Sequence, residues 1–200
     1  MKIILVYTPR SGSTSILKYF SKLKSDYECF NEPWFSWMIS NVYNGNTLNY
    51  NDVLRKDKVF IKTSPATCPV PLETLIKDFD KVIFLLRKDK KEQVESSILV
   101  HNESSFLNKT KRKYNLYQIT QHERDEMSKR YESHNTLIET TAAKHNLPLY
   151  YYEDLYYGSF NRLFEELDLH YNEQYYNEFL NISNRYRNGT TEIKTDNTII

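Results

Sequence analysis

The sequence predicts a three-layer α/β domain, in which a central parallel sheet is doubly wound with helices on both faces. Four short segments are almost continuously apolar, and they span residues 2–7, 58–62, 81–87 and 147–152. Strands of a parallel sheet are covered on both faces, so they lack the apolar–polar alternation of half-exposed strands. Segments with helical spacing separate these runs. Such alternation is typical of a doubly wound sheet, whose ligands bind beyond the carboxyl ends of the strands.

Helices are expected between and after these strands. The first follows a small-residue loop, the third is opened by Pro71, and the longest is expected to cover one face of the sheet. They span residues 14–24, 34–43, 71–78, 90–100, 121–145, 159–167 and 172–181. The chain contains no internal repeat and no linker rich in Pro, Gly or Ser, so one domain over residues 1–200 is expected.

The charge balance excludes some classes of partner. The chain has 200 residues, with 27 basic and 26 acidic side chains and a formal net charge of +1. The sequence contains no long block of one sign, so nothing favours binding to nucleic acid or to an anionic membrane. Any site for an anion must therefore be built locally.

The cysteines and the opening segment indicate the compartment. Cys29 and Cys68 lie far apart, without the spacing of zinc ligands, which argues against a zinc site or a disulfide framework. The opening MKIILVYT has too few apolar residues before Pro9 for a secretory signal, and no run approaches the length of a membrane span. We expect a cytoplasmic protein without an integral membrane segment.

The segment TPRSGST, residues 8–14, directly follows the first predicted strand. A tight turn at Gly12 and a helix that opens with Ser13 and Thr14 direct backbone N–H groups and the helix N-terminus to one point, which favours an anion there. Arg10 adds a fixed positive charge. The alternative is an ordinary strand-to-helix turn with a Ser/Thr cap.

This loop lacks the pattern that binds nucleoside triphosphates. A GxxxxGK[ST] loop aligned on Gly12 would need Gly in place of Tyr7 and Lys in place of Ser13. The strand at 81–87 ends in Arg87 rather than in an Asp that could hold magnesium. These differences argue against a Mg²⁺-dependent triphosphate site.

Arg87 is a second candidate for anion binding, because a charge at the end of an apolar strand is costly unless it faces a crevice or finds a partner. The following helix brings Ser96 and Ser97 back toward the same edge. A guanidinium and a hydroxyl suit a phosphate, so the two anion sites together indicate a nucleotide phosphorylated at both ends. The alternative is a surface Arg paired with Asp89 or Glu92.

Together these motifs resemble the sulfotransferases that use 3′-phosphoadenosine 5′-phosphosulfate (PAPS), whose fold is similar to that of P-loop-containing nucleoside triphosphate hydrolases. TPRSGST is similar to their 5′-phosphosulfate loop. RKDKKEQVES (87–96) is similar to their 3′-phosphate segment, with the Arg-to-Ser spacing of the bacterial glycolipid branch that sulfates trehalose. YYYEDL (150–155) and the helix after it resemble an element common in the superfamily. FNEPWF (30–35) resembles the segment that presents a catalytic Glu in carbohydrate sulfotransferases.

The resemblance implies that the chain transfers a sulfuryl group from PAPS to a hydroxyl of a carbohydrate or glycolipid, without a metal, and releases adenosine 3′,5′-bisphosphate. It implies that Arg87 and Ser96 hold the 3′-phosphate, although helical phase places Ser97, not Ser96, on the apolar face of the helix. The 5′-phosphosulfate would be held by Pro9, Arg10, Ser11, Gly12, Ser13 and Thr14.

Two residues are the candidates for catalysis. Glu32 immediately precedes a Pro-Trp pair that starts a helix and matches the carboxylate of the family, so it suits a general base for the acceptor hydroxyl. Its alternative is a first-turn Glu that favours the helix dipole, and His101 is the rival base. Lys62 ends the strand at 58–62 and could steady the bridging oxygen of the leaving group, or it could be a rim Lys.

Other side chains receive weaker interpretations. Trp34, Phe35 and Trp37 are expected either to line an acceptor pocket or to form a hydrophobic helix face. Glu153 and Asp154 are interpreted as structural residues at the start of a helix.

Two alternative functions stay open. One is a metal-dependent nucleotide or small-molecule kinase with a degenerate phosphate loop, and the missing Lys and Asp of such a loop weigh against it. The other is a non-catalytic nucleotide-binding module, against which the presence of Glu32 and Lys62 weighs.

Overall fold

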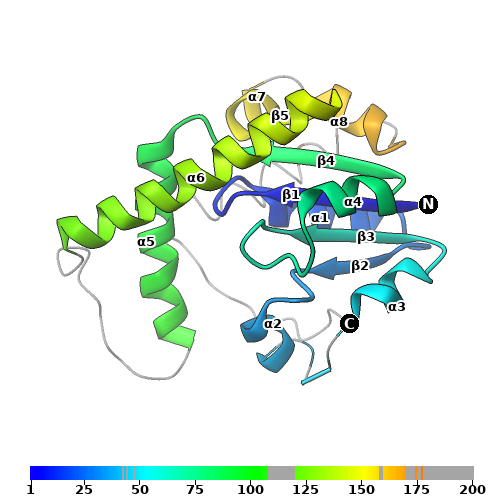
Figure 1. Ribbon diagram of the computed structural model, residues 1–200, viewed down its shortest axis with the longest axis horizontal. Helices are drawn as coiled ribbons and strands as arrows, with labels where there is room; N and C mark the ends of the chain where they lie inside the picture. Colours follow the sequence, from blue (N-terminus) through cyan, green and yellow to red (C-terminus); the bar gives the residue numbers. More distant parts are fainter. Residues whose placement is uncertain are drawn as a thin grey trace.

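The computed structural model describes residues 1–41, 43, 45, 46, 48–107, 120–157, 160–169, 174 and 177. Within these residues the centre is a five-stranded, all-parallel sheet with the strand order β2-β3-β1-β4-β5 (Figure 1). Helices flank the sheet on both faces, so the predicted α/β class is confirmed. The strands are β1 (Lys2–Tyr7), β2 (Glu28–Asn31), β3 (Val59–Thr63), β4 (Lys81–Leu86) and β5 (Leu149–Tyr151).

The middle strand is β1, which pairs with β3 on one side and with β4 on the other. Val6 is the register partner of Thr63 in β3 and of Phe84 in β4. Ile3, Ile4 and Val6 are fully buried, as a central parallel strand requires. Because all strands are parallel, the segments that follow β1, β3 and β4 meet at one edge of the sheet.

One face of the sheet is covered by α1 (Ser13–Leu23), α7 (Tyr152–Tyr157) and α8 (Phe160–Glu166). Ile16 and Phe20 lie four residues apart, so they share one side of α1. Both pack into the cluster that contains Leu5 of β1.

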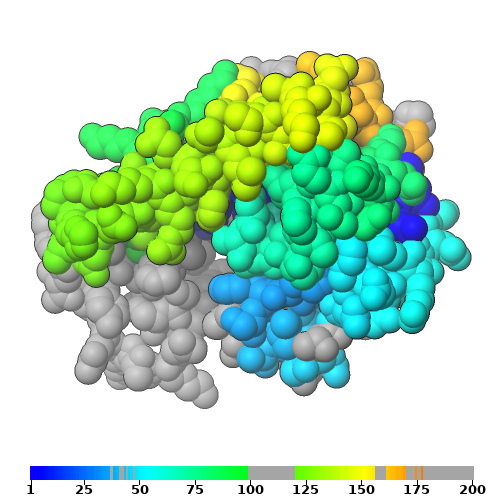
Figure 2. Space-filling model, viewed as in Figure 1, coloured from blue at the N-terminus to red at the C-terminus, as the bar shows by residue number. Residues whose placement is uncertain are grey.

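The opposite face is covered by α3 (Tyr50–Leu54), α4 (Leu72–Asp78) and α6 (Gln121–His145). Val6 of β1 packs in one cluster with Leu75 of α4 and Ile138 of α6. Thr120 and Glu123 form a reciprocal capping box at the start of α6. Figure 2 shows these three helices as a continuous layer over this face.

Two further helices lie near the carboxyl ends of the strands. These are α2 (Ser36–Asn41), which follows β2, and α5 (Lys90–Leu107), which follows β4 and contacts α6 (Figure 1). No helix in the described part of the chain is both long enough and apolar enough to cross a lipid bilayer.

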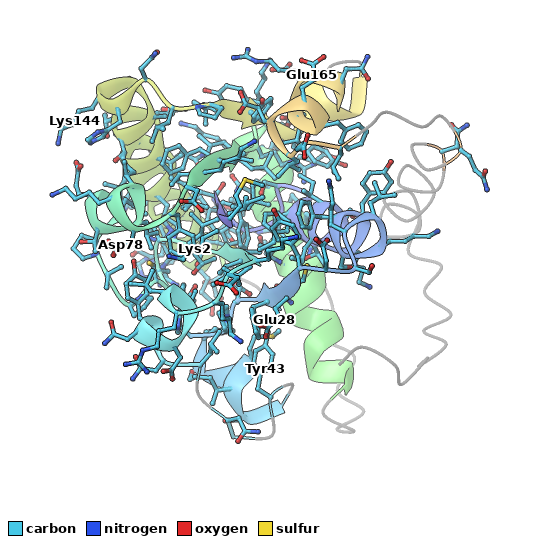
Figure 3. The ribbon with its side chains drawn as sticks, turned by 90° about the vertical axis from the view of Figure 1, so that its right-hand side faces the viewer. Lys2, Glu28, Tyr43, Asp78, Lys144 and Glu165 are labelled. Carbon is cyan, nitrogen blue, oxygen red and sulfur yellow. The ribbon has the colours of Figure 1, made fainter. Side chains whose placement is uncertain are left out.

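The amino ends of the strands form the other edge of the sheet, which faces the viewer in Figure 3. Exposed ion pairs occupy this edge, such as Lys56 with Glu28 at 2.5 Å and Lys58 with Asp26 at 2.6 Å. Exposed pairs of this kind contribute little stability. Charges on this edge neutralise one another.

The four predicted strands are present, with boundaries shifted by two residues or fewer. The prediction missed β2, whose four residues ECFN are partly exposed and include only two apolar side chains. It also missed α3, and it placed Glu153 and Asp154 at the start of a helix without giving the bounds of α7. Tyr152, predicted as the last strand residue, begins α7 instead, and α5 continues to Leu107 rather than ending at residue 100. The helix predicted at 172–181 lies outside the described residues, apart from 174 and 177.

Candidate active site

A cavity of about 410 Å³ lies at the carboxyl edge of the sheet. Its walls come from the ends of β1, β2 and β3, from Arg87 after β4, from the first turns of α1 and α7, and from the first two turns of α5. Cavities of about 300–1,000 Å³ are typical of small-molecule sites. The lining residues are Tyr7, Pro9, Arg10, Gly12, Ser13, Thr14, Ser15, Asn31, Glu32, Lys62, Arg87, Glu92, Glu95, Ser96 and Tyr152.

The topology of the sheet explains this position. The loop after β1 leads to α1 on one face, whereas the segments after β3 and β4 lead to α4 and α6 on the other. Loops that diverge from neighbouring strands leave a crevice between them, which is where ligands bind in doubly wound sheets. The structure therefore brings nearly all the predicted site residues together. Ser11 is the exception, because it is fully buried and its hydroxyl has no hydrogen-bond partner among the described residues.

Two side chains from the segment after β4 donate hydrogen bonds to the loop after β1. Nε2 of the fully buried Gln93 donates to the carbonyl of Pro9 at 2.6 Å and to the Thr8 hydroxyl at 3.0 Å. A guanidinium nitrogen of Arg87 donates to the carbonyl of Arg10 at 3.2 Å. These bonds occupy carbonyl groups that would otherwise repel an anion at this loop.

The start of α1 follows directly. Gly12 is the N-cap residue, with a left-handed φ of 79°, and no side chain caps the helix. The Ser/Thr cap considered as an alternative is therefore absent here. The Gly12 carbonyl accepts bonds from Ser15 and Ile16, whereas the N–H groups of Ser13 and Thr14 have no acceptor within the helix. They lie at the positive end of the helix dipole, next to the cavity.

Two charged lining residues have a strained backbone. Arg10 and Glu32 adopt left-handed φ values of 67° and 47°. This conformation costs a non-glycine residue about 1–2 kcal/mol, and such costs are commonly found at functional sites. The Glu32 N–H donates to the carbonyl of Lys62 at 2.8 Å, which extends the pairing of β2 with β3 by one residue.

The Arg87 side chain is only 6% exposed and contacts two carboxylates. One guanidinium nitrogen pairs with Glu92, and Nε lies 3.6 Å from Glu153. Glu153 also accepts the N–H groups of Lys88 and Asp89 at 2.9 and 3.1 Å, so it fixes the turn after β4. Glu92, which the sequence offered as an alternative partner of Arg87, does form an ion pair with it. An anion that binds to Arg87 must compete with this carboxylate.

Ser96 and Ser97 have different surroundings. Ser96 lines the cavity, where its hydroxyl accepts a bond from Nε of Arg10 at 2.9 Å. Ser97 is buried between α5 and α6, where it accepts a bond from the Tyr131 hydroxyl at 2.6 Å and donates to the Gln93 carbonyl. The apolar face of α5, which includes Ser97, therefore packs against α6. Ser96 lies on a different face of the helix, which is turned toward the cavity.

Lys62 and Tyr7 line the cavity together with the loop and Glu32. The Lys62 side chain is 3% exposed, and its ammonium group donates to the Thr14 hydroxyl at 2.7 Å and lies 4.6 Å from the centre of the Tyr7 ring. Burial lowers the pKa of Lys62 to about 8; Glu32 opposes this shift, and Arg10 and Lys18 reinforce it. Lys62 is a buried cation and not a rim residue.

The Tyr7 hydroxyl faces the Glu32 carboxylate. Burial raises the pKa of Tyr7 well above its ordinary value, and the negative charge of Glu32 and its capacity to accept a hydrogen bond from the hydroxyl raise it further. Tyr7 therefore stays a neutral donor. Sequence reasoning treated Tyr7 only as a strand residue, because an aromatic side chain at a strand end is typical of packing.

Several other functional candidates were missed. Gln93 and Glu95 belong to the polar run KKEQVES, in which no local signal separates a buried residue from exposed ones. Asn31 and Tyr152 reach the cavity from β2, which was not predicted, and from α7, whose bounds were not predicted.

Trp34 and Phe35, two of the predicted aromatic residues, do not line the cavity. Trp34 packs against Tyr50 with 5.7 Å between ring centres, and Phe35 is 38% exposed. The side chains of Trp37 and His101 lie outside the described part of the structure. Glu153 and Asp154 lie in the first turn of α7, as expected.

The cavity carries both signs of charge. Arg10, Lys62 and Arg87 line it together with Glu32, Glu92 and Glu95. The chain matches no protein-family model and none of the curated proteins.

The buried charge of Lys62 should reduce stability in a pH-dependent way. Its pKa is about 8 in the folded protein and 10.5 ordinarily, so the unfolded chain binds more protons between these values and stability rises with pH there. Below pH 8 the cost is complete, at about 3 kcal/mol. Lys62→Met should therefore raise the free energy of unfolding at pH 7, and the gap to the parent should narrow by about 2 kcal/mol by pH 9.5.

Urea unfolding at a series of pH values measures this gap. Lys77→Met, at an exposed position in α4, is the matched control for the exchange of a lysine for a methionine. A gap for Lys62→Met that stays constant with pH would show that Lys62 is not a destabilising buried cation.

Proposed function

We propose that the chain is a sulfotransferase that transfers the sulfuryl group of PAPS to a hydroxyl of an acceptor, for which a carbohydrate or glycolipid is the best candidate. One observation carries the proposal: Glu32 and Lys62 share a single cavity with the loop 8–14 and with Arg87 and Ser96. These segments are far apart in the sequence and correspond to the motifs that resemble the family. We also infer a P-loop-like architecture, which the small-residue loop between β1 and α1 supports.

The residues of the cavity fit the donor. The first-turn N–H groups of α1, with Arg10 and the hydroxyls of Ser13 and Thr14, suit a 5′-phosphosulfate. Arg87 and Ser96, which both bond to Arg10 at the edge of the loop, suit a 3′-phosphate. Ser11 would act through the backbone, because its side chain does not line the cavity.

PAPS supplies a sulfuryl group on a phosphate leaving group. Glu32 takes the proton of the acceptor hydroxyl while the acceptor oxygen bonds to sulfur and the bond from sulfur to the phosphate oxygen breaks. The Lys62 ammonium donates a hydrogen bond to that departing oxygen, and the Thr14 hydroxyl orients the ammonium. A sulfuryl group carries less charge than a phosphoryl group, so a cation and N–H donors are adequate stabilisation.

Nucleotide binding tests the proposal against a kinase. Adenosine 3′,5′-bisphosphate at a hundredfold excess over its Kd should raise the free energy of unfolding by about 2.7 kcal/mol through mass action. EDTA should not change this effect, and ATP should have a clearly smaller one. A thermal-shift series with both nucleotides, with and without Mg²⁺, measures it. Stabilisation by ATP with Mg²⁺ alone would favour the kinase and reject the sulfotransferase.

The two proposed phosphate sites should respond differently to mutation. Arg87→Ala removes charge-assisted bonds to the 3′-phosphate, so it should weaken adenosine 3′,5′-bisphosphate about 10- to 100-fold and adenosine 5′-phosphate much less. Arg10→Ala should weaken both. Glu92→Gln removes the carboxylate that competes for Arg87, so it should tighten the bisphosphate about fivefold and leave adenosine 5′-phosphate unchanged.

Calorimetric titration of both nucleotides into each variant gives these ratios. The Glu92 variant is the sharper probe, because Arg87 keeps its bond to the loop carbonyl of Arg10 in it. Equal effects on the two nucleotides would mean that Arg87 does not contact a 3′-phosphate.

Glu32 distinguishes an enzyme from a binding module. Glu32→Gln keeps the shape but cannot take a proton, so kcat should fall by about 10²- to 10⁴-fold while the bisphosphate still binds. Transfer from labelled PAPS to a panel of glycans, glycolipids and phenols identifies an acceptor for the assay. Glu126→Gln, at an exposed carboxylate of α6 that does not line the cavity, is the matched control and should keep kcat.

A near-parental kcat in Glu32→Gln would remove Glu32 as the base. Tight binding of the bisphosphate without transfer to any acceptor would favour the non-catalytic module.

A further inference from the structure

Tyr7 lies between the base and the cation of the proposed reaction. The face of its ring contacts the Lys62 ammonium, with 4.6 Å from Nζ to the ring centre, and its hydroxyl faces the Glu32 carboxylate. The residue is 5% exposed, so the surrounding core fixes the ring. One side chain thus contacts both charges by different groups.

The backbone brings Glu32 and Lys62 close together. Asn31 is the register partner of Lys62, and Glu32 follows it, with its N–H bonded to the Lys62 carbonyl at 2.8 Å. Opposite charges at such positions attract strongly in a buried site. The described structure nevertheless has no direct ion pair between them, because the Lys62 ammonium is directed to Thr14 and the Tyr7 ring.

A direct ion pair would impair both groups. A carboxylate bound to an ammonium is a poorer proton acceptor, and an ammonium bound to a carboxylate is less free to donate to a leaving oxygen. The two charges must be near each other and still separate.

We propose that Tyr7 is a positioning residue that holds the Glu32 carboxylate apart from the Lys62 ammonium. The hydroxyl retains the carboxylate, and the ring face offers the ammonium a second favourable contact. The effect on rate rests on the proposed function, whereas the separation of the two charges does not.

Tyr7→Phe tests this role because it keeps the ring and removes only the hydroxyl. It should lower kcat about 10- to 100-fold and change the Kd of adenosine 3′,5′-bisphosphate by less than about twofold. The double variant Tyr7→Phe/Glu32→Gln should be no slower than Glu32→Gln alone, because Tyr7 acts through Glu32. Additive losses, or an equal loss of nucleotide affinity, would overturn the proposal.

The titration of Lys62 gives a second readout that needs no acceptor. The groups that face Lys62 are Glu32, Arg10, Lys18 and the Tyr7 ring. In Tyr7→Phe the released carboxylate should approach the ammonium, so the pKa of Lys62 should rise above its value of about 8. In Glu32→Gln the pKa should fall, because the favourable charge is lost.

NMR of 13C-labelled lysine follows this titration, with the Lys62 signal identified by its loss in Lys62→Met. Tyr150→Phe is the matched control: Tyr150 is a buried tyrosine of β5 whose hydroxyl bonds to the Arg162 carbonyl, away from the cavity. It should leave kcat and the Lys62 titration unchanged. A Lys62 pKa in Tyr7→Phe that stays at about 8 or falls would overturn the proposal. If no acceptor is sulfated, the proposed function fails and the titration still decides the role of Tyr7.

Discussion

The site depends on how the loop after β1 is anchored. Its carbonyl groups at Pro9 and Arg10 bond to side chains of Gln93 and Arg87, both of which come from the segment after β4. A tight loop beside an anion site must direct its carbonyl groups away from the ligand, because their partial negative charge would repel it. Gly12 permits the turn, but it does not determine the direction of the carbonyl groups that precede it. Gln93 and Arg87 determine that direction, and they lie next to the loop because β4 is adjacent to β1 in the sheet.

The same adjacency places opposite charges in a small volume. Three cations and three carboxylates line the cavity among the described residues, and two of the cations, Lys62 and Arg87, are almost fully buried. A buried cation without compensation is costly. Arg87 is compensated by carboxylates, whereas Lys62 contacts a hydroxyl and an aromatic ring, and burial lowers the pKa of Lys62. The more weakly compensated cation lies beside the helix N-terminus, where an anionic ligand would complete its environment.

The sequence was sufficient for features that have a local signature. Apolar runs predicted β1, β3, β4 and β5, and strand ends predicted where Arg10, Lys62 and Arg87 would meet. The short edge strand β2 has no such signature, because its apolar residues are few and half-exposed. The roles of Tyr7 and Gln93 depend on contacts with Glu32 and Pro9, which are remote in the sequence. Pattern analysis cannot find these contacts without the strand order, since the order decides which strand ends are neighbours.

The two carboxylates on Arg87 differ in a way that matters for anion binding. Glu153 is 21% exposed and is fixed by the N–H groups of Lys88 and Asp89, so its removal would disrupt the turn after β4. Glu92 is 58% exposed, and its side chain bonds to Arg87 from the first turn of α5. An anion arriving at Arg87 can therefore displace Glu92 into solvent at small cost while Glu153 keeps the guanidinium in place. Under the proposed function, Glu92 neutralises Arg87 until the donor binds, and a ligand without a second phosphate gains nothing from that exchange.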